Sequence, residues 1–345
     1  MSEEERIVVI GASAGGVSAL IQLTRNLPPD FPAPILVVLH IAAEAPSLLA
    51  PILNREGMLP VVTAEDGQRY RPGQIYVAPP DRHLLVASGG KLQVTRGPRE
   101  NRHRPAVDPL FRSAALVAGP RAIAVVLTGA LDDGTAGMLA INRAGGIGVA
   151  QDPADALYPS MPSSAIAHAR VDHVVPLAGM AGLLVRLVSE PHAAAVDPGS
   201  TEGDLKLEQG IAALDRAALA GDDRPGQPSP YSCPECGGVL WEIRDATFAR
   251  YRCRVGHAYS PETMLGAQDD LLEEALWSAM KTLEESARLS QRLAANERER
   301  GRTWMAERFE EKEADARKRA DVIRRHLIRD HDATVPVDTV EQKSR

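Results

Sequence analysis

Short apolar runs alternate with helical stretches through residues 6–188. The runs are continuous and rich in β-branched side chains, which is typical of strands that are buried on both faces of a sheet. The segments between them repeat apolar positions every three or four residues, as amphipathic helices do. We therefore predict a doubly wound α/β domain with a mostly parallel sheet. The predicted strands are 7–10, 35–40, 74–79, 92–95, 123–128 and 146–151, and the predicted helices are 15–25, 46–54, 109–118, 134–144 and 163–169.

The pattern changes after residue 190 and divides the rest of the chain into four parts. Residues 191–231 are rich in Pro, Gly, Ser and Asp, which indicates a linker, with one short helix near 204–219. A small module at 232–260 holds all three cysteines of the chain. Residues 261–333 are highly charged, almost free of Pro, and apolar at helical spacing, so we predict a long helical hairpin or coiled coil there. Residues 334–345 are predicted to be a disordered tail.

Composition narrows the class of protein. The chain has 345 residues and a net charge of −7, which argues against a nucleic-acid partner. No apolar run reaches the roughly 18 residues of a membrane span. The N-terminus MSEEERIVV is acidic where a signal peptide is basic, so we expect a cytoplasmic protein.

A candidate nucleophile lies at the first strand end. Ser13 sits in GASAGG, between the first predicted strand and the helix after it. His40 ends the second strand, and Asp133 follows the strand at 123–128. The carboxyl ends of parallel strands share one edge of the sheet, so these three side chains can meet there. A serine hydroxyl needs such a base and orienting acid to react. Alternatively, the serine is a turn residue, and Asp132 with Asp133 forms a turn and a helix cap.

Two other interpretations of GASAGG fit less well. A dinucleotide-binding loop would have glycine in place of Ser13 and an acidic residue at the end of the second strand, where His40 stands. The α/β-hydrolases place the acid before the histidine along the chain, whereas the order here is Ser, His, Asp.

Six motifs spread over residues 5–190 resemble the catalytic domain of CheB-type protein-glutamate methylesterases of bacterial chemotaxis. They are IGASAGG, VVLH, APPDRHLLV, RPAVDPLFRSAA, LTGALDDGTAGM and QDPADALYPSMPSSAIA. The resemblance implies that 1–190 is a methylesterase catalytic domain with the Ser13, His40 and Asp133 triad. It implies hydrolysis of glutamate γ-methyl esters on methyl-accepting chemotaxis receptors, with glutamine deamidation as a second activity and no cofactor for catalysis.

The resemblance also assigns minor site residues and marks departures. It implies that the backbone N–H groups of Ala14 and Ala130 stabilise the oxyanion. Leu131 stands where the family usually has glycine, so a left-handed backbone is disfavoured there. His83 matches a family histidine and is either a core or rim residue or one that shapes the site. Because the chain begins at the first catalytic strand, we expect it to lack the N-terminal receiver domain usual in this enzyme.

The cysteine module carries a metal-binding pattern. Cys233, Cys236, Cys253 and His257 follow the spacing C-x2-C, then sixteen residues, then C-x3-H. This is typical of a closed structural zinc site in a zinc-ribbon-like module; the alternative is a metal-free module with buried thiols. Since the triad lies in a different region, we expect esterase activity of 1–190 to survive without metal. A different class of function also stays open, in which the protein is a catalytically idle scaffold of a signalling complex, with helices that bind partners or associate with a second copy.

Overall fold

The computed structural model describes residues 5–192, 202–221, 224–245 and 248–333. The chain forms two compact units, Met1–Leu265 and Gly266–Arg345. The finer predicted division into a catalytic domain, a linker, a cysteine module and a helical region stays a prediction. The predicted tail at 334–345 lies outside the described residues.

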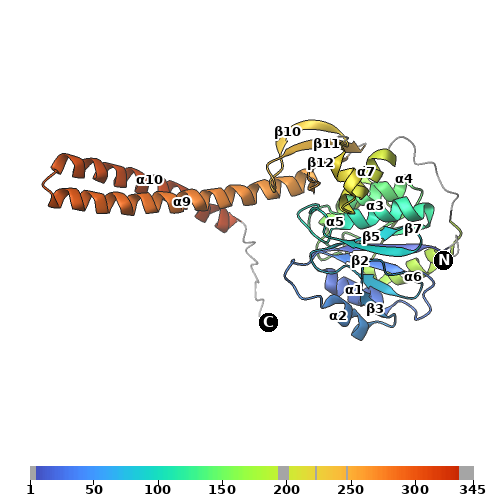
Figure 1. Cartoon of the computed structure of the whole chain (residues 1–345). Helices are drawn as coiled ribbons and strands as arrows, with labels where there is room; N and C mark the ends of the chain where they lie inside the picture. The colour runs from blue at the N-terminus through green and yellow to red at the C-terminus, as the bar shows by residue number, and fades with distance from the viewer. Residues whose placement is uncertain (1–4, 193–201, 222–223, 246–247, 334–345) are drawn as a thin grey trace, which may run out of the picture. The chain divides into compact units, whose positions relative to one another are not determined.

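The first unit is built on a seven-stranded parallel sheet (Figure 1). The strand order β3-β4-β2-β1-β7-β8-β9 places β1 at the centre, with β2 and β7 as its neighbours. Every residue of β1 and β2 is buried, which explains their continuous apolar sequences. The predicted α/β fold with a parallel sheet is confirmed. The strands are β1 Ile7–Ala12, β2 Ile35–Leu39, β3 Val61–Thr63, β4 Ile75–Val77, β7 Ala122–Val126, β8 Ile147–Gln151 and β9 His173–Val175.

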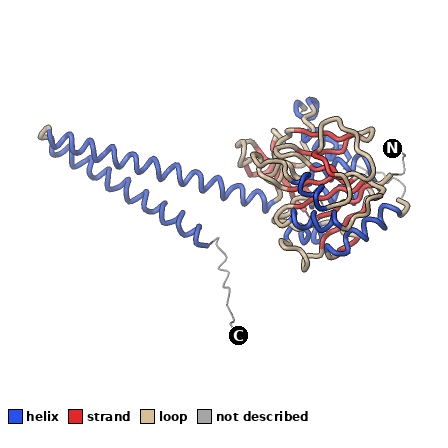
Figure 2. Tube along the Cα trace, turned by 90° about the horizontal axis from the view of Figure 1, so that it is seen from below, coloured by secondary structure: helices blue, strands red, loops and turns tan. Residues whose placement is uncertain are grey.

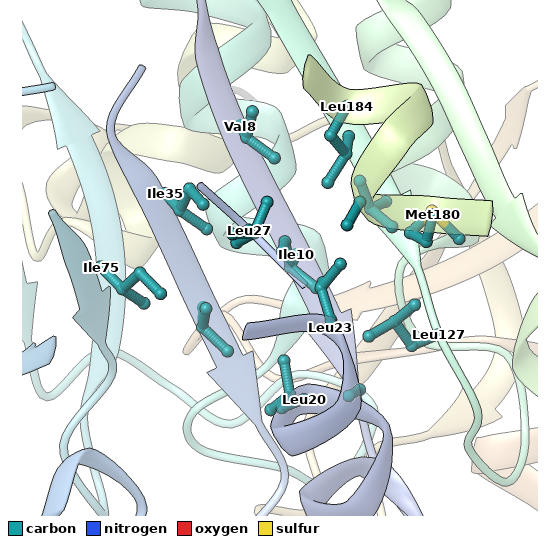
Figure 3. Packing of buried hydrophobic residues seen from close by; sticks show 14 of the residues in the cluster. Val8, Ile10, Leu20, Leu23, Leu27, Ile35, Ile75, Leu127, Met180 and Leu184 are labelled. Carbon is teal, nitrogen blue, oxygen red and sulfur yellow. The ribbon is translucent and has the colours of Figure 1, made fainter. Parts of the chain in front are cut away.

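Helices cover both faces of this sheet. On one face α1 and α6 bury their leucines against Val8, Ile10 and Ile35 of the central strands (Figure 3). The leucines of α2 belong to the same cluster. On the other face α3, α4 and α5 pack against the alternate side chains, including Val9 and Val126. Each face therefore has its own apolar core. The helices are α1 Gly16–Arg25, α2 Leu49–Glu56, α3 Val107–Ala118, α4 Thr135–Arg143, α5 Ser160–His168 and α6 Leu177–Ser189, with a 3-10 turn η1 at Gly119–Arg121.

The prediction for 92–95 was wrong in one respect. This strand, β6 Lys91–Thr95, lies outside the main sheet and pairs antiparallel with β5 His83–Ala87 in a separate hairpin. The strands β3, β5 and β9 were not predicted. The edge strands β3 and β9 have three residues each, too few for a periodic pattern, whereas the equally short β4 lies within the longer apolar run 74–79.

A second, antiparallel sheet of four strands contains the cysteines, in the order β10-β11-β12-β13. Before it, two helices replace the single one predicted near 204–219, because Leu214 adopts a left-handed φ of 59° between them. The first of them, α7, contacts α3 of the parallel-sheet region. The bounds are α7 Glu202–Ala212, α8 Arg216–Ala220, β10 Gln227–Ser232, β11 Val239–Asp245, β12 Phe248–Cys253 and β13 Ala258–Tyr259.

Two long helices follow β13, as predicted (Figure 2). They are α9 Pro261–Glu299 and α10 Thr303–Ala333. In the second unit they run side by side, with Gly301 at a φ of 72° in the turn and an ion pair between Glu284 and Arg324. Neither these helices nor the others in the described ranges could cross a membrane, since none is both long and apolar enough.

Candidate active site and metal site

Ser13 lies immediately after the carboxyl end of the central strand β1. Its backbone N–H donates to the carbonyl of Thr128 (3.0 Å), which ties it to the loop after β7. The chain then turns at Gly15, whose φ of 74° suits glycine, and α1 begins at Gly16. The strand therefore ends with the serine side chain at the start of a helix, where the helix dipole favours negative charge.

The structure brings the three predicted triad side chains together in series. The hydroxyl of Ser13 donates to His40 Nδ1 (3.0 Å), and His40 Nε2–H donates to Asp133 Oδ2 (2.7 Å). The imidazole side chain is 5% exposed and the carboxylate 2%, so this contact is shielded from water. In the tautomer that satisfies both contacts, the proton is on Nε2 and the lone pair on Nδ1 faces the serine. This is the geometry that serine activation requires.

Four donors hold the carboxylate of Asp133. Oδ2 accepts from His40 and from the N–H of Val107 (2.7 Å), and Oδ1 accepts from Asn101 Nδ2 (3.0 Å) and the N–H of Asp108 (3.1 Å). Burial alone would raise the pKa of Asp133, but its hydrogen bond with His40 and the other donors outweigh burial and lower that pKa. The carboxylate is therefore ionised and fixed in one orientation.

The neighbouring Asp132 points to a different partner. Its Oδ1 accepts from the hydroxyl of Ser260 (2.9 Å), a residue that comes directly after β13. Burial raises the pKa of Asp132 to about 8, against the hydrogen bond from Ser260, which lowers it. Asp133, and not Asp132, contacts the histidine.

Three residues around this site, His103, Asn101 and Asp108, were not identified from the sequence. The ring of His103 stacks on His40, with centroids 3.7 Å apart, and burial lowers its pKa to about 4. Asn101 bridges Asp133 and Asp108, whose pKa burial and the charge of Asp133 raise to about 7. Asp108 lies in the motif RPAVDPLFRSAA, but Asn101 and His103 lie in an irregular loop without any periodic signal.

The loop after β7 comes close to the serine. A Cβ at Gly129 would lie 2.8 Å from Ser13 Cβ, so this position must be glycine. Ala130 and Leu131 follow it, and Leu131 does adopt the disfavoured left-handed backbone, with a φ of 62°. His83 lies elsewhere: it is fully buried, and its Nε2–H donates to the carbonyl of Pro98 (2.8 Å).

The four predicted metal ligands converge in the antiparallel sheet. Their ligand atoms all lie within 4.8 Å of one another. His257 Nδ1 is 3.6 Å from the sulfurs of both Cys233 and Cys253, and the sulfurs of Cys236 and Cys253 are 3.7 Å apart. Tetrahedral zinc with Zn–S bonds of about 2.3 Å and a Zn–N bond of about 2.1 Å places nitrogen and sulfur about 3.6 Å apart and two sulfurs about 3.8 Å apart. The four residues therefore fit a tetrahedral metal ion.

Neighbouring groups suit such an ion. His257 Nε2 faces Glu235 Oε2 (3.3 Å), the contact that commonly orients a metal-binding histidine. The contact between Cys233 and Cys253 lowers the pKa of Cys233 and raises that of Cys253, because the two thiols share one proton between them.

A parallel α/β sheet with a serine, a histidine and an aspartate hydrogen-bonded in series at its carboxyl edge has the side-chain arrangement of the serine hydrolases. Residues 8–184 match the family model of the CheB methylesterases, and the chain belongs to this family.

Curated relatives and a solved structure agree with this assignment. A protein-glutamate methylesterase/protein-glutamine glutaminase of Burkholderia lata is 45% identical over 179 residues, which are 51% of this chain and 49% of that protein. One of Geobacter metallireducens is 44% identical over 182 residues, 52% of this chain and 50% of the relative. The crystal structure of the Thermotoga maritima CheB methylesterase catalytic domain has a TM-score of 0.51 and 39% identity, and the match covers 53% of this chain and 98% of that one. The chain thus spans about half the length of the curated relatives it matches.

Proposed function

We propose that the protein is a protein-glutamate methylesterase, a carboxylic ester hydrolase that acts on glutamate γ-methyl esters of methyl-accepting chemotaxis receptors or similar signalling proteins. The observation that carries the proposal is the hydrogen-bonded series from Ser13 through His40 to Asp133. Membership of the CheB methylesterase family supports it. The names of the curated relatives add protein-glutamine glutaminase, so deamidation of receptor glutamine is part of the proposal.

The residues have defined roles in the reaction. The hydroxyl of Ser13 attacks the ester carbonyl while His40 Nδ1 takes its proton and then delivers it to the leaving methanol. Asp133 keeps the other imidazole proton on Nε2 and stabilises the imidazolium that forms. Water, deprotonated by the same histidine, then releases the acyl group as glutamate.

Backbone donors stabilise the oxyanion in this scheme. Ala14 directly follows the nucleophile and lies just before α1. Ala130 directly follows Gly129, which lies so close to Ser13 that a Cβ on Gly129 would be 2.8 Å from Ser13 Cβ. The backbone N–H groups of Ala14 and Ala130 are the two donors. Two fixed donors at that point would oppose the negative charge on the tetrahedral intermediate.

The Cys/His cluster has a separate role in the proposal. Cys233, Cys236, Cys253 and His257 bind one structural zinc ion, which supplies folding energy to a small antiparallel sheet. The fit of the three inter-ligand distances to a tetrahedron supports zinc over a metal-free module. Elemental analysis of purified protein should find about one zinc per chain, and Cys236→Ser should lower that value; a full-length protein with no metal and a protected sheet in hydrogen exchange would refute the zinc assignment.

The esterase assignment is tested by methanol release from a methylated receptor cytoplasmic fragment. Wild type should release methanol, while Ser13→Ala and His40→Ala should each lose several orders of magnitude in turnover. The double variant should be little worse than either single one, because the two residues act as a unit. Ser18→Ala, an exposed change on α1, is the matched control and should keep wild-type turnover. Absence of Ser13-dependent hydrolysis, with partner binding that is lost on truncation of the helices, would favour the scaffold function instead.

A further inference from the structure

Asn101 connects the catalytic acid with the cysteine module. Its side-chain Nδ2 donates to Asp133, as described above, and its Oδ1 accepts from the N–H of Ser260 (3.1 Å) and the hydroxyl of Thr263 (3.3 Å). The backbone N–H of Asn101 donates to the carbonyl of Ala258 in β13 (2.8 Å). Asn101 is 5% exposed and its amide has partners on both sides, so it cannot rotate without breaking buried hydrogen bonds.

Ser260 makes a second connection, to the loop between β7 and α4 that carries Asp132 and Asp133 (the acid loop). Its hydroxyl donates to Asp132, the residue directly before the catalytic acid. The same hydroxyl accepts from the N–H of Thr263 (3.1 Å), while the hydroxyl of Thr263 accepts from the N–H of Ser260 (2.8 Å). This reciprocal pair is a capping box at the first turn of α9. Ser260 is therefore held on one side by the helix start and on the other by the acid loop.

The metal-ligand residue His257 lies three residues before Ser260. The carbonyl of His257 accepts from the N–H of Cys253 (3.0 Å), and β13 begins with the next residue, Ala258. Since the turn that carries two ligands continues directly into the residues that hold Asn101, the conformation of that turn decides where Ala258 and Ser260 lie.

A buried ionic cluster fixes the module to the catalytic region. Glu100, next to Asn101, pairs with Arg112 of α3 (2.6 Å) and with Arg252 of β12 (3.0 Å). Arg252 also pairs with Glu208 of α7 (3.2 Å). All four side chains are at most 2% exposed. Arg252 thus contacts Glu100 of the catalytic region and Glu208 of α7 in one buried cluster, and this cluster joins the module to the loop that carries Asn101.

We propose, building on the esterase function proposed above, that the metal-binding module completes the active site, with Asn101 and Ser260 as positioning residues that hold Asp133 against His40. In this arrangement a folded, metal-loaded module is required for full turnover, and the triad of the parallel-sheet domain is incompletely oriented without it. The module acts on the chemical step and not on substrate binding, because it works through Asn101, which contacts Oδ1 of Asp133, the oxygen that His40 does not contact.

The test uses the full chain with Ser260→Ala, Ser260→Thr and a matched control. Loss of the Ser260 hydroxyl should lower kcat about tenfold with KM within about twofold, as expected for one hydrogen bond to a carboxyl group. Ser260→Thr retains the hydroxyl and should recover most of that loss. Ser229→Ala removes a serine of β10, in the same antiparallel sheet, whose hydroxyl donates to the Leu240 carbonyl, and this variant should keep wild-type kcat. Equal kcat for Ser260→Ala and Ser229→Ala would overturn the proposal.

Metal removal tests whether the module must hold its metal ion for full turnover. Treatment of reduced wild type with a zinc chelator should lower kcat at least tenfold, and added zinc should restore it; unchanged kcat in metal-free protein would overturn the proposal.

A spectroscopic readout separates this inference from the esterase assignment. The low-field proton NMR signal of His40 Nε2–H reports its hydrogen bond to Asp133 without any substrate. It should shift or broaden in Ser260→Ala and in zinc-free protein, and stay unchanged in Ser229→Ala. An unperturbed signal in all samples would refute the positioning role even if hydrolysis is observed, whereas a perturbed signal in a protein without hydrolysis would support positioning and refute only the esterase.

Discussion

Asp133→Asn is the sharpest test of the candidate triad, because the carboxylate accepts hydrogen bonds and has no donor of its own. Each oxygen of Asp133 receives two N–H donors: His40 and Val107 on Oδ2, Asn101 and Asp108 on Oδ1. The amide of asparagine has an oxygen that accepts and an NH2 group that donates. In either orientation the NH2 group takes the place of one carboxylate oxygen, where it meets two N–H donors and can accept from neither. Two hydrogen bonds to a charged group are lost, each worth about 1.5–3 kcal/mol, and we expect the free energy of unfolding to fall by about 3–6 kcal/mol.

The effect on turnover follows from the imidazole tautomer. If the amide NH2 faces His40, the proton moves to Nδ1, and the nitrogen that faces Ser13 can no longer act as a base. By analogy with the same substitution in serine proteases, kcat should fall on the order of 10⁴-fold. The measurements are kcat from methanol release and unfolding in urea, at a temperature where the variant is folded.

Asp132→Asn is the matched control. Its pKa of about 8 means that the neutral form is favoured at pH 7, and an amide resembles a neutral carboxyl group. The amide also keeps an oxygen to accept from Ser260. We expect kcat to change less than about fivefold by this substitution, within the loss of one neutral hydrogen bond. A loss as large as that of Asp133→Asn would move the orienting role to Asp132 and refute the assignment.

Three further outcomes are expected. Glu208→Gln should lower the free energy of unfolding in urea by about 3–5 kcal/mol, since it removes the charge that faces Arg250 and Arg252; an effect below about 1 kcal/mol would contradict a buried network. Folding raises the pKa of Asp132 from 3.8 to about 8, so this residue contributes stability that is fully present below about pH 4 and is lost as the pH rises toward 8. The urea midpoint of Asp132→Asn should therefore change less between about pH 4 and 8 than that of wild type. Parallel pH curves for the two proteins would disprove the raised pKa. Leu131→Gly should leave the melting temperature unchanged or higher, because it relieves a left-handed φ that costs a non-glycine residue about 1 kcal/mol, whereas Leu48→Gly, at a φ of −93°, should lower it.

The central strands and the candidate triad could be predicted because their signals are local. Fully buried strands such as β1 and β2 have continuous apolar sequences, and each is followed at once by a polar residue, Ser13 or His40. The parallel topology then requires these residues to share an edge. The exact partner of each acid could not be read from the adjacent pair Asp132 and Asp133, since that depends on which way each side chain turns in the loop.

The contacts between the two sheets could not be predicted for a different reason. Asn101, Glu208 and Ser260 lie in segments whose composition is typical of loops or linkers, and their partners are more than a hundred residues away or in another element. No periodic pattern records a hydrogen bond between distant loops. For this reason the sequence predicted a catalytic region independent of the module, whereas the contacts of Asn101 and Ser260 favour dependence.

The strand order has a consequence for how activity returns during refolding. β1 and β2 are joined by α1 alone, so Ser13 and His40 can come together within one local β-α-β unit. Asp133 arrives only when β7 inserts on the other side of β1, which closes a loop of about a hundred residues and carries a larger entropic barrier. Helix formation and early collapse therefore precede a working ester-cleaving centre. In a refolding experiment the recovery of turnover should lag behind the far-ultraviolet circular dichroism signal.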